Sequence, residues 1–325
     1  MKKILSMALA AVLTVGSMLT FASCTQTDSN AYTVGICQQM PHVALDAATQ
    51  GFKDALDEAL GEGNVTYIEQ NAQGDPTTCT TIVNDFVSKN VDLIMANATN
   101  ALQAAANGTA TIPVLGTSIT EYGVALDISD FNGLVGNNVS GTSDLAPLDQ
   151  QAAMITELFP DAKVVGMLYC SAEPNSEYQV KKVGEYLEAK NITIKEFAFA
   201  DSNDVAAVAA AAAAACDVIY VPTDNTAATC TEAINGTVLP TKTPIIAGEE
   251  GICSGCGVAT LSISYYDLGV ATGKMAAKIL KGEAKVEEMP IEYAATFTKK
   301  YNKTNCEALG IDIAALEAAG YVVIE

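Results

Sequence analysis

The sequence predicts an α/β protein made of two doubly wound parallel-sheet lobes, joined by a multi-strand hinge with a ligand cleft between them. Apolar runs of strand length alternate with helical stretches, which is typical of βαβ units. The runs are continuously apolar, as expected of strands that are covered on both faces. They form two series of five with the same rhythm: 33–37, 65–69, 93–96, 113–115 and 133–135, then 164–169, 192–197, 218–221, 244–247 and 259–263.

Local signals predict helices between these strands. In 44–60, Leu45, Ala48, Phe52 and Leu56 recur at helical spacing. Pro76 after Asp75 is typical of a helix start, with an N-cap followed by an N1 proline. The expected helices are 44–60, 76–88, 204–215 and 266–281.

Three polar or glycine-rich segments are candidates for the connections between the lobes: 140–144, 248–257 and 285–293. Two lobes joined in this way bind ligand between the carboxyl ends of their strands and close by hinge motion. The expected division is a signal peptide 1–23, a polar tether 24–31, lobe 1 at 32–142 with parts of 259–290, and lobe 2 at 143–258 with parts of 291–325.

The N-terminus has the layout of an export signal. Lys2 and Lys3 precede an apolar run that ends in Phe21, Ala22 and Ser23, directly before Cys24. This order resembles a bacterial lipoprotein signal, which implies cleavage before Cys24 and a lipid on its thiol. The alternative is an ordinary secreted protein in which Cys24 is incidental. No second stretch approaches the roughly 18 apolar residues of a membrane span, so we expect anchoring by lipid only.

The amino-acid composition limits the classes of partner and ligand that the protein can bind. The formal net charge of −21 repels phosphate backbones and argues against nucleic acid. The chain has neither Arg nor Trp, so a ligand carboxylate must be held by backbone amides, hydroxyls or amide side chains. Eight cysteines remain besides Cys24, and the sequence leaves open whether they are thiols or disulfides. Cys253 and Cys256 are expected to be a structural pair in a loop rather than a metal or redox site.

Polar residues cluster directly after the strands of both series, where an open α/β sheet binds its ligand. For any one of them a helix cap is the simpler explanation, but one cap per helix would suffice. The candidate ligand-binding residues are Gln38, His42, Asn71, Thr99, Ser118, Tyr122, Asn175, Ser176, Thr223, Asp224 and Asn225. Enzyme motifs such as a nucleophile elbow, a phosphate loop or a zinc helix are missing, so no catalysis, cofactor or metal is expected.

Several motifs resemble the substrate-binding proteins of ABC transporters of the tryptophan-binding type, which have the periplasmic-binding-protein class I fold. They are Gly35-Ile36-Cys37-Gln38, His42-Val43-Ala44-Leu45-Asp46, Gln70-Asn71-Ala72-Gln73-Gly74-Asp75, Gly141-Thr142-Ser143-Asp144, Glu173-Pro174-Asn175-Ser176, Thr223-Asp224-Asn225 and Tyr265-Tyr266-Asp267-Leu268-Gly269. Thr120-Glu121-Tyr122 departs from the family's Thr-Asp-Pro, and Thr99-Asn100 departs from its Thr-Pro. Both differences bear on the first-lobe wall of the cleft.

The resemblance implies an amino-acid ligand, often aromatic. Asp224 with Asn225 would hold the ammonium, while Asn175, Ser176, Thr99 and Ser118 would hold the carboxylate. His42, Gln38 and Tyr122 would face the side chain of the ligand. Tyr265 or Tyr266 could reach the cleft, although core packing is the simpler expectation for both.

The partners implied are an ABC permease and its ATPase. The protein would act as a monomer outside the cytoplasm, held at the bacterial cell membrane by the lipid on Cys24. Two alternatives remain open: the same fold could bind a sugar or nucleoside, or the chain could be a ligand-sensing lipoprotein.

Overall fold

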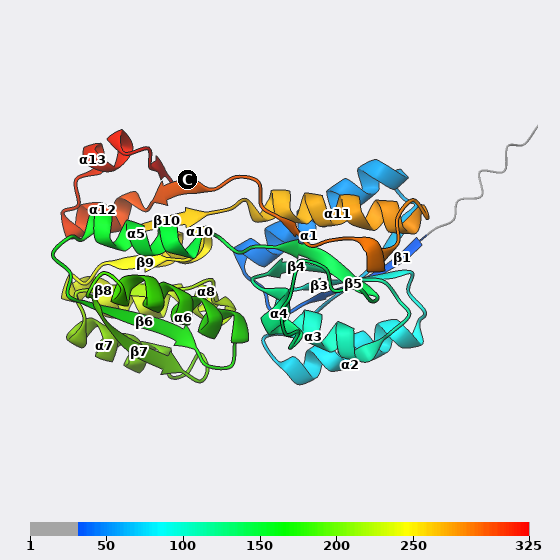
Figure 1. Cartoon of the computed structure of the whole chain (residues 1–325), viewed down its shortest axis with the longest axis horizontal. Helices are drawn as coiled ribbons and strands as arrows, with labels where there is room; N and C mark the ends of the chain where they lie inside the picture. Colours follow the sequence, from blue (N-terminus) through cyan, green and yellow to red (C-terminus); the bar gives the residue numbers. More distant parts are fainter. Residues whose placement is uncertain (1–31, 325) are drawn as a thin grey trace, which may run out of the picture. The chain divides into compact units, whose positions relative to one another are not determined.

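The computed structural model describes residues 32–324 and contains two sheets, each with helices on both faces (Figure 1). The first sheet is parallel throughout, in the order β11-β5-β4-β3-β1-β2. Its strands are β1 (Tyr32–Gln38), β2 (Val65–Asn71), β3 (Leu93–Asn97), β4 (Val114–Ile119), β5 (Val139–Ser143) and β11 (Glu292–Tyr293). The predicted fold class is confirmed.

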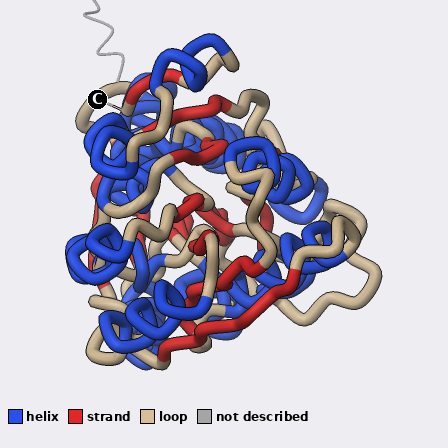
Figure 2. Tube along the Cα trace, turned by 90° about the vertical axis from the view of Figure 1, so that its left-hand side faces the viewer, coloured by secondary structure: helices blue, strands red, loops and turns tan. Residues whose placement is uncertain are grey.

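The second sheet has the order β13-β12-β10-β9-β8-β6-β7 and one antiparallel pair, β10 with β12. Its strands are β6 (Val164–Cys170), β7 (Thr193–Phe199), β8 (Val218–Val221), β9 (Ile245–Ala247), β10 (Ala259–Ser262), β12 (Thr298–Tyr301) and β13 (Val322–Val323). Figure 2 shows the strands of both sheets in red, with helices in blue around them.

The helices separate into layers according to the core that each one covers. On the first sheet, α1 and α11 cover one face, and α2 and α3 cover the other. The members are α1 (Val43–Leu60), α2 (Pro76–Ser88), α3 (Thr99–Gly108), α4 (Tyr122–Ala125) and α11 (Tyr265–Leu280), with a 3-10 turn η2 (Val286–Glu288). The helices expected at 44–60, 76–88 and 266–281 are thus confirmed to within one residue at each end.

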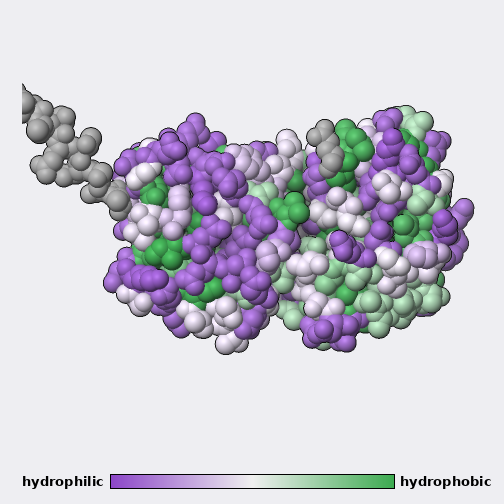
Figure 3. Space-filling view, turned by 180° about the vertical axis from the view of Figure 1, so that it is seen from behind, coloured by the Kyte–Doolittle hydropathy of each residue, from purple (hydrophilic) through white to green (hydrophobic). Residues whose placement is uncertain are grey.

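The second sheet is covered by α5 and α6 on one face and by α7 to α10 on the other. The members are α5 (Leu148–Leu158), α6 (Pro174–Glu188), α7 (Val205–Ala215), α8 (Asn225–Thr229), α9 (Thr231–Val238), η1 (Leu239–Thr241), α10 (Glu250–Gly255), α12 (Lys303–Leu309) and α13 (Ile313–Ala318). The outward face of α7 consists of alanines, and Figure 3 shows pale green surface in this part of the second lobe.

The fifth strand of the first series was predicted wrongly. Residues 133–135 are not a strand, and Gly133 and Gly136 have φ of 92° and 81°, in the left-handed region. The strand is β5, which overlaps the polar segment 140–144 that the sequence predicts as a connection between the lobes. Its hydroxyls are satisfied inside the protein, because Thr142 bonds to Thr117 and Thr272, and Ser140 bonds to Met289.

A second correction concerns the connections between the sheets. Residues 248–257 do not cross between the sheets, since 250–255 form α10 on the second sheet. The chain passes between the sheets from β5 to α5, starting at Asp144 within the expected segment 140–144, and also from β10 to α11 and from β11 to β12. The expected segment 285–293 stays with the first sheet, because β11 pairs with β5.

Helices α1 and α11 lie side by side (Figure 1) and approach each other closely. A Cβ atom on Gly51 would overlap the carbonyl oxygen of Tyr266, and one on Gly269 would overlap that of Ala48. Only glycine permits this approach at both positions. Among residues 32–324, no helix is long and apolar enough to span a bilayer.

Candidate functional site

The carboxyl ends of four strands of the first sheet bring polar residues into one row. The register pairs Gln38 with Asn71 on one side and with Asn97 on the other, and Asn97 with Thr117. The row lies where an open parallel sheet binds its ligand. The structure therefore supplies the polar edge that the sequence predicts, although not every member is free to contact a ligand.

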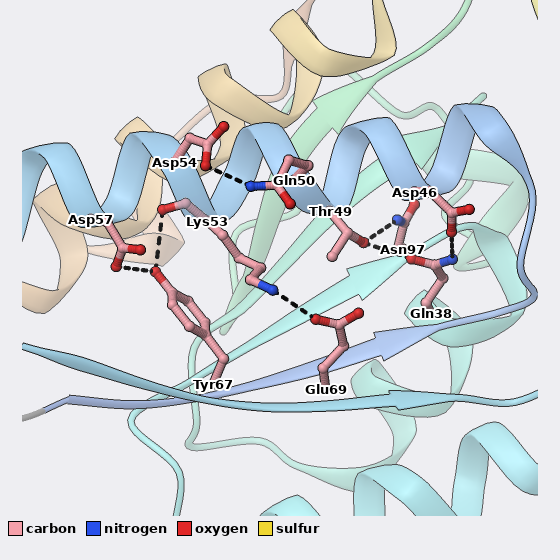
Figure 4. A network of polar contacts seen from close by, with 10 residues as sticks. All are labelled: Gln38, Asp46, Thr49, Gln50, Lys53, Asp54, Asp57, Tyr67, Glu69 and Asn97. Atoms are coloured by element: carbon pink, nitrogen blue, oxygen red, sulfur yellow. Dashed lines mark hydrogen bonds and ion pairs between the residues drawn. The ribbon is translucent and has the colours of Figure 1, made fainter. Parts of the chain in front are cut away.

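Gln38 is used inside the first lobe. Its amide nitrogen donates to Met40 O at 3.0 Å and to Asp46 Oδ1 at 2.6 Å, while its Oε1 accepts from the Thr49 hydroxyl at 2.7 Å. Figure 4 shows this side chain between β1 and α1, beside Thr49 and Asn97. Both amide hydrogens are spent on these contacts. Gln38 therefore positions α1, and a contact between Gln38 and the side chain of a ligand stays a prediction.

Asn71 and Tyr122 also have structural positions. Asn71 Oδ1 accepts from the backbone N–H of Gln73 at 2.9 Å and so stabilises a turn after β2. Tyr122 is 1% exposed, stacks on Phe131, and donates its hydroxyl to Thr142 O at 3.0 Å. The prediction that Tyr122 lines the cleft is corrected, because its ring belongs to the first-lobe core.

The first-lobe edge contains two strained residues. Ala98 has φ 81° and ψ 165°, a region that is essentially restricted to glycine, and Ser118 has φ 56°. Ala98 directly precedes Thr99, which opens α3 and is buried. The Ser118 Oγ is buried and has no hydrogen-bond partner within residues 32–324. Strain and an unpaired hydroxyl at one edge are features of ligand-binding sites.

In the second lobe, the buried Glu173 carboxylate organises the start of α8. Its Oε2 accepts from the backbone N–H and the side-chain Nδ2 of Asn225, at 3.0 and 2.7 Å. Its Oε1 accepts from the backbone N–H and the hydroxyl of Thr226, at 2.8 and 2.7 Å. Glu173 belongs to the motif Glu173-Pro174-Asn175-Ser176, and only the tertiary structure shows that its carboxylate holds the start of α8.

Asp224 lies beside Glu173 and is also engaged. Its Oδ2 accepts from the backbone N–H of Cys170 at 2.7 Å, and its Oδ1 caps α8 at Ala227 N, also at 2.7 Å. Burial, followed by the charge of Glu173, raises the pKa of Asp224 to about 7. Asp224 is therefore a helix N-cap, which is the simpler of the two roles that the sequence leaves open for it.

Asn175, Ser176 and Thr223 complete this cluster. The Asn175 Nδ2 donates to Thr223 O at 3.0 Å, and at 3.3 Å it also contacts Ser176 Oγ. The Asn175 Oδ1 is buried and lacks a partner within the described chain. Five of the predicted residues, Asn175, Ser176, Thr223, Asp224 and Asn225, are therefore brought together.

His42 connects the two lobes. Its Nε2 lies 3.1 Å from the Oδ1 of Asn225, so the start of α1 contacts the start of α8. Burial lowers the pKa of His42, against the opposing effects of Asn225, Glu173 and Asp46. His42 also lines a cavity of about 790 Å³ between α1, α10 and the β10–α11 connection, together with Glu249 and Tyr265.

Two further carboxylates lie where the lobes join. Asp144 follows β5, and its Oδ2 accepts from the Tyr265 hydroxyl at 2.9 Å, which links two of the inter-lobe connections. Glu249 caps α10 by accepting from Gly251 N at 2.6 Å and from Ile252 N. Burial raises the pKa of Asp144 to about 6 and that of Glu249 to about 7. Asp144 belongs to the motif Gly141-Thr142-Ser143-Asp144, and Glu249 follows a predicted strand, but their burial depends on contacts across the hinge that the sequence does not reveal.

The buried acidic side chains of the inter-lobe region have no basic partners in the part of the chain that the structure describes. Asp144, Glu173, Asp224 and Glu249 are buried, and none of them forms an ion pair with a lysine of the described chain. Uncompensated buried carboxylates are costly. The inter-lobe region is therefore suited to a ligand that brings a positive charge.

The cysteines do not form part of this site. All eight cysteines that the structure describes are free, and Cys253 and Cys256 are buried in and beside α10. Cys253 lies in the short helix α10, where the sequence predicts a loop, and Cys256 directly follows this helix. No group of metal-ligating side chains is present among residues 32–324. Cys24 lies outside the described residues, so its lipidation stays a prediction.

A family model described as ABC transporter substrate binding protein matches residues 33–318. The chain belongs to the ABC transporter substrate-binding protein family. The resemblance found in its motifs is thereby confirmed. A relative from Clostridioides difficile named "Tyrosine-binding protein" is 36% identical over 308 residues, covering 89% of this chain and 87% of the relative. Substrate-binding proteins of ABC transporters function outside the cytoplasm.

Solved structures of similar sequence have the same fold as this substrate-binding protein. A Streptococcus pneumoniae ABC domain in complex with L-Trp is 33% identical, with a TM-score of 0.84 over 90% of this chain and 99% of that one. A ligand-free, open substrate-binding protein from Clostridium difficile is 34% identical over the same shares, but its TM-score is 0.69. The two identities are nearly equal, so the difference in TM-score reflects how the lobes are arranged. We infer that the arrangement here is more similar to that of the L-Trp complex. The direct contact between His42 and Asn225 agrees with this.

Proposed function

We propose that this substrate-binding protein captures an amino acid between its two lobes and delivers it to an ABC permease driven by a partner ATPase. The observation that carries the proposal is the set of buried carboxylates without a basic partner at the junction of the lobes. An α-ammonium group would supply the missing charge, and its bond to a carboxylate strengthens when the cleft closes and excludes water.

The same observation separates an amino acid from a neutral sugar or nucleoside. A neutral ligand would bring hydroxyls, which leave the buried negative charges uncompensated. Each buried carboxylate without a positive partner would then raise the free-energy cost of closing the lobes. The charge of the region therefore favours the amino acid over the alternative ligands that the same fold could accept.

The ligand carboxylate is better placed in the first lobe than in the second. Asn175 and Ser176 open α6, but the Glu173 carboxylate contacts Asn175 Nδ2 at 3.3 Å and would repel another anion. Ser118 and Thr99 carry hydroxyls on the first lobe, whereas Glu173 belongs to the second lobe. We therefore propose that the ligand carboxylate binds Ser118 and Thr99 on the first lobe. The polar cluster of Thr223 and Asn225 then forms the opposite wall of the site.

An aromatic side chain is the best candidate for the rest of the ligand. The C. difficile relative is named for tyrosine, and the S. pneumoniae structure contains L-Trp. His42 lies at the rim of the cleft with an aromatic ring, while Tyr265 lies at the hinge. We propose that these two rings lie on opposite sides of the ligand side chain.

Binding can be tested with the chain from Thr25 onward, without the segment that precedes it. Because the protein has no Trp, the fluorescence of L-Trp reports its own binding directly. A thermal-shift screen would then compare amino acids with sugars and nucleosides. Ligand at one hundred times its Kd should add about 2.7 kcal/mol to the free energy of unfolding. A response to a sugar, with none to any amino acid, would refute the proposal.

We also propose that a lipid on Cys24 anchors the protein to the outer face of the cell membrane. The charged, apolar and small-residue order before Cys24 supports this. The full-length protein expressed in a bacterium should partition into a detergent phase, and Cys24→Ala should move it to the aqueous phase. Equal partition of both proteins would show that Cys24 is not the anchor.

A further inference from the structure

We propose that Asp144, and not Asp224, binds the ammonium group of the ligand. This inference rests on the proposed function and specifies one contact of the same site. It follows from a comparison of the four buried carboxylates at the junction of the lobes, in which only Asp144 has an oxygen free for a new partner.

In three of the four carboxylates, both oxygens accept hydrogen bonds from the protein. Glu173 accepts two hydrogen bonds on Oε1 and at least two on Oε2, all from the second lobe. Asp224 accepts a backbone N–H from the end of β6 on one oxygen and from the start of α8 on the other. Glu249 accepts two backbone N–H groups at the start of α10, one on each oxygen. These bonds hold helices in place and are made without any ligand.

Asp144 differs from them. Its Oδ2 accepts from the Tyr265 hydroxyl, but its Oδ1 is buried with no hydrogen-bond partner within residues 32–324. The residue is only 4% exposed. A buried carboxylate oxygen without a partner costs free energy that a charged donor would recover.

The backbone places Asp144 at the ligand-binding edge of the first sheet. Its N–H donates to Ile119 O at 3.1 Å, directly beyond Ser118 at the carboxyl end of β4. The Thr120 hydroxyl faces the same carboxylate. From the second lobe, Glu249 lies close enough to affect it electrostatically. Asp144 is therefore located where the edges of the two sheets meet.

Ser118 supplies an independent sign that this edge receives a ligand. It is 6% exposed, its Oγ also lacks a partner, and its φ of 56° is unusual for serine. Ser118 is adjacent in sequence to Ile119, whose carbonyl accepts from Asp144 N, and each of Ser118 and Asp144 has one unpaired polar atom within residues 32–324. A hydroxyl and a carboxylate oxygen match the carboxylate and the ammonium of one amino acid. An α-amino acid presents these two groups on adjacent atoms, so one ligand can satisfy both.

The experiment compares an amino acid with the same molecule lacking its ammonium group. L-tyrosine and 3-(4-hydroxyphenyl)propionate are titrated calorimetrically into wild type, Asp144→Asn and Asp224→Asn. Wild type should prefer tyrosine. Asp144→Asn should lose about 30-fold or more in affinity for tyrosine, as expected when a buried charge pair loses one partner. Its affinity for the propionate should change less than about 3-fold.

Two controls separate a ligand contact from a structural role. Asp149→Asn removes an exposed charge from α5 and should leave both affinities unchanged. Tyr265→Phe removes the Oδ2 hydrogen bond but keeps the charge, so the preference for tyrosine over the propionate should persist. Equal losses for both ligands in Asp144→Asn would show a structural role and overturn the inference.

If Asp144→Asn fails to fold, the titrations of Asp224→Asn show which of the two aspartates binds the ammonium. Retention of the preference for tyrosine in Asp224→Asn supports Asp144, and its loss assigns the ammonium to Asp224. If wild type binds no amino acid, the proposed function fails and this inference fails with it. If wild type binds tyrosine and Asp144→Asn keeps the full preference, only the anchor is wrong.

Discussion

The Nε2 of His42 lies 3.1 Å from the Oδ1 of Asn225, and this contact joins the N-terminus of α1 in one lobe to that of α8 in the other. The Asn225 Nδ2 donates to Glu173, so its Oδ1 must be the acceptor toward His42. The His42 Nε2 must therefore carry the proton. A chain of two hydrogen bonds thus runs from the first lobe to the buried Glu173.

His42→Ala should shorten the lifetime of the closed complex. Loss of one hydrogen bond of about 1 kcal/mol predicts an approximately 5-fold faster release of ligand, with little change in the association rate. Stopped-flow fluorescence of bound L-Trp can measure both rates. His42→Gln keeps a donor at a similar distance and should release ligand more slowly than His42→Ala. Identical release rates for wild type and His42→Ala would show that the contact between His42 and Asn225 does not hold the lobes closed.

The stability of the ligand-free protein should decrease as the pH rises. Burial raises the pKa of Asp144 to about 6 and those of Asp224 and Glu249 to about 7. Between the ordinary carboxyl pKa near 4 and these values, the folded state binds more protons than the unfolded state. The free energy of unfolding therefore falls with rising pH in this window.

His42 has the opposite effect, because burial lowers its pKa and its contribution is lost as the pH falls through about 6.5. Three carboxyls should outweigh one imidazole. Calorimetry should find a loss on the order of 2 kcal/mol between about pH 5.5 and pH 8. Asp75, Asp85 and Asp217 have lowered pKa values and titrate below this window. A midpoint that rises with pH would contradict the assignment.

The close contact of α1 and α11 makes Gly51 and Gly269 sensitive to substitution. Gly51→Ala should destabilise the protein by about 1–3 kcal/mol, because the added methyl group overlaps the backbone of α11. Gly236→Ala in α9 is the matched control, since no atom lies within 4 Å of the position of its Cβ. It should be neutral or stabilising by up to about 1 kcal/mol. Equal effects of the two substitutions in urea unfolding would argue against the packing.

Ala98 is expected to store strain at the first-lobe edge. Its φ of 81° with ψ of 165° suits glycine, so Ala98→Gly should stabilise the protein by about 1–3 kcal/mol. Ala106→Gly, inside α3, should instead destabilise it by about 1 kcal/mol. Urea unfolding of the two variants checks the difference in sign. A loss of stability in Ala98→Gly would show that this backbone is not strained.

Much of the fold could be predicted because its signals are local. The periodicity of 44–60 and the cap at Asp75 indicated α1 and α2, and both helices are present at those positions. The strand β5 could not be predicted in the same way. Ser140 and Thr142 are polar, and their burial depends on partners distant in sequence, Met289 for Ser140 and both Thr117 and Thr272 for Thr142.

For the candidate site, the sequence by itself determined which segments carry polar groups to the cleft, because parallel strands expose their carboxyl ends at one edge. It could not determine which of those groups are free. Gln38, Tyr122 and Asp224 are satisfied by atoms of the protein, whereas one oxygen of Asp144 is not. That difference depends on neighbours brought together by folding. The hydrogen-bonding capacity left over at each side chain is therefore a property of the tertiary structure alone.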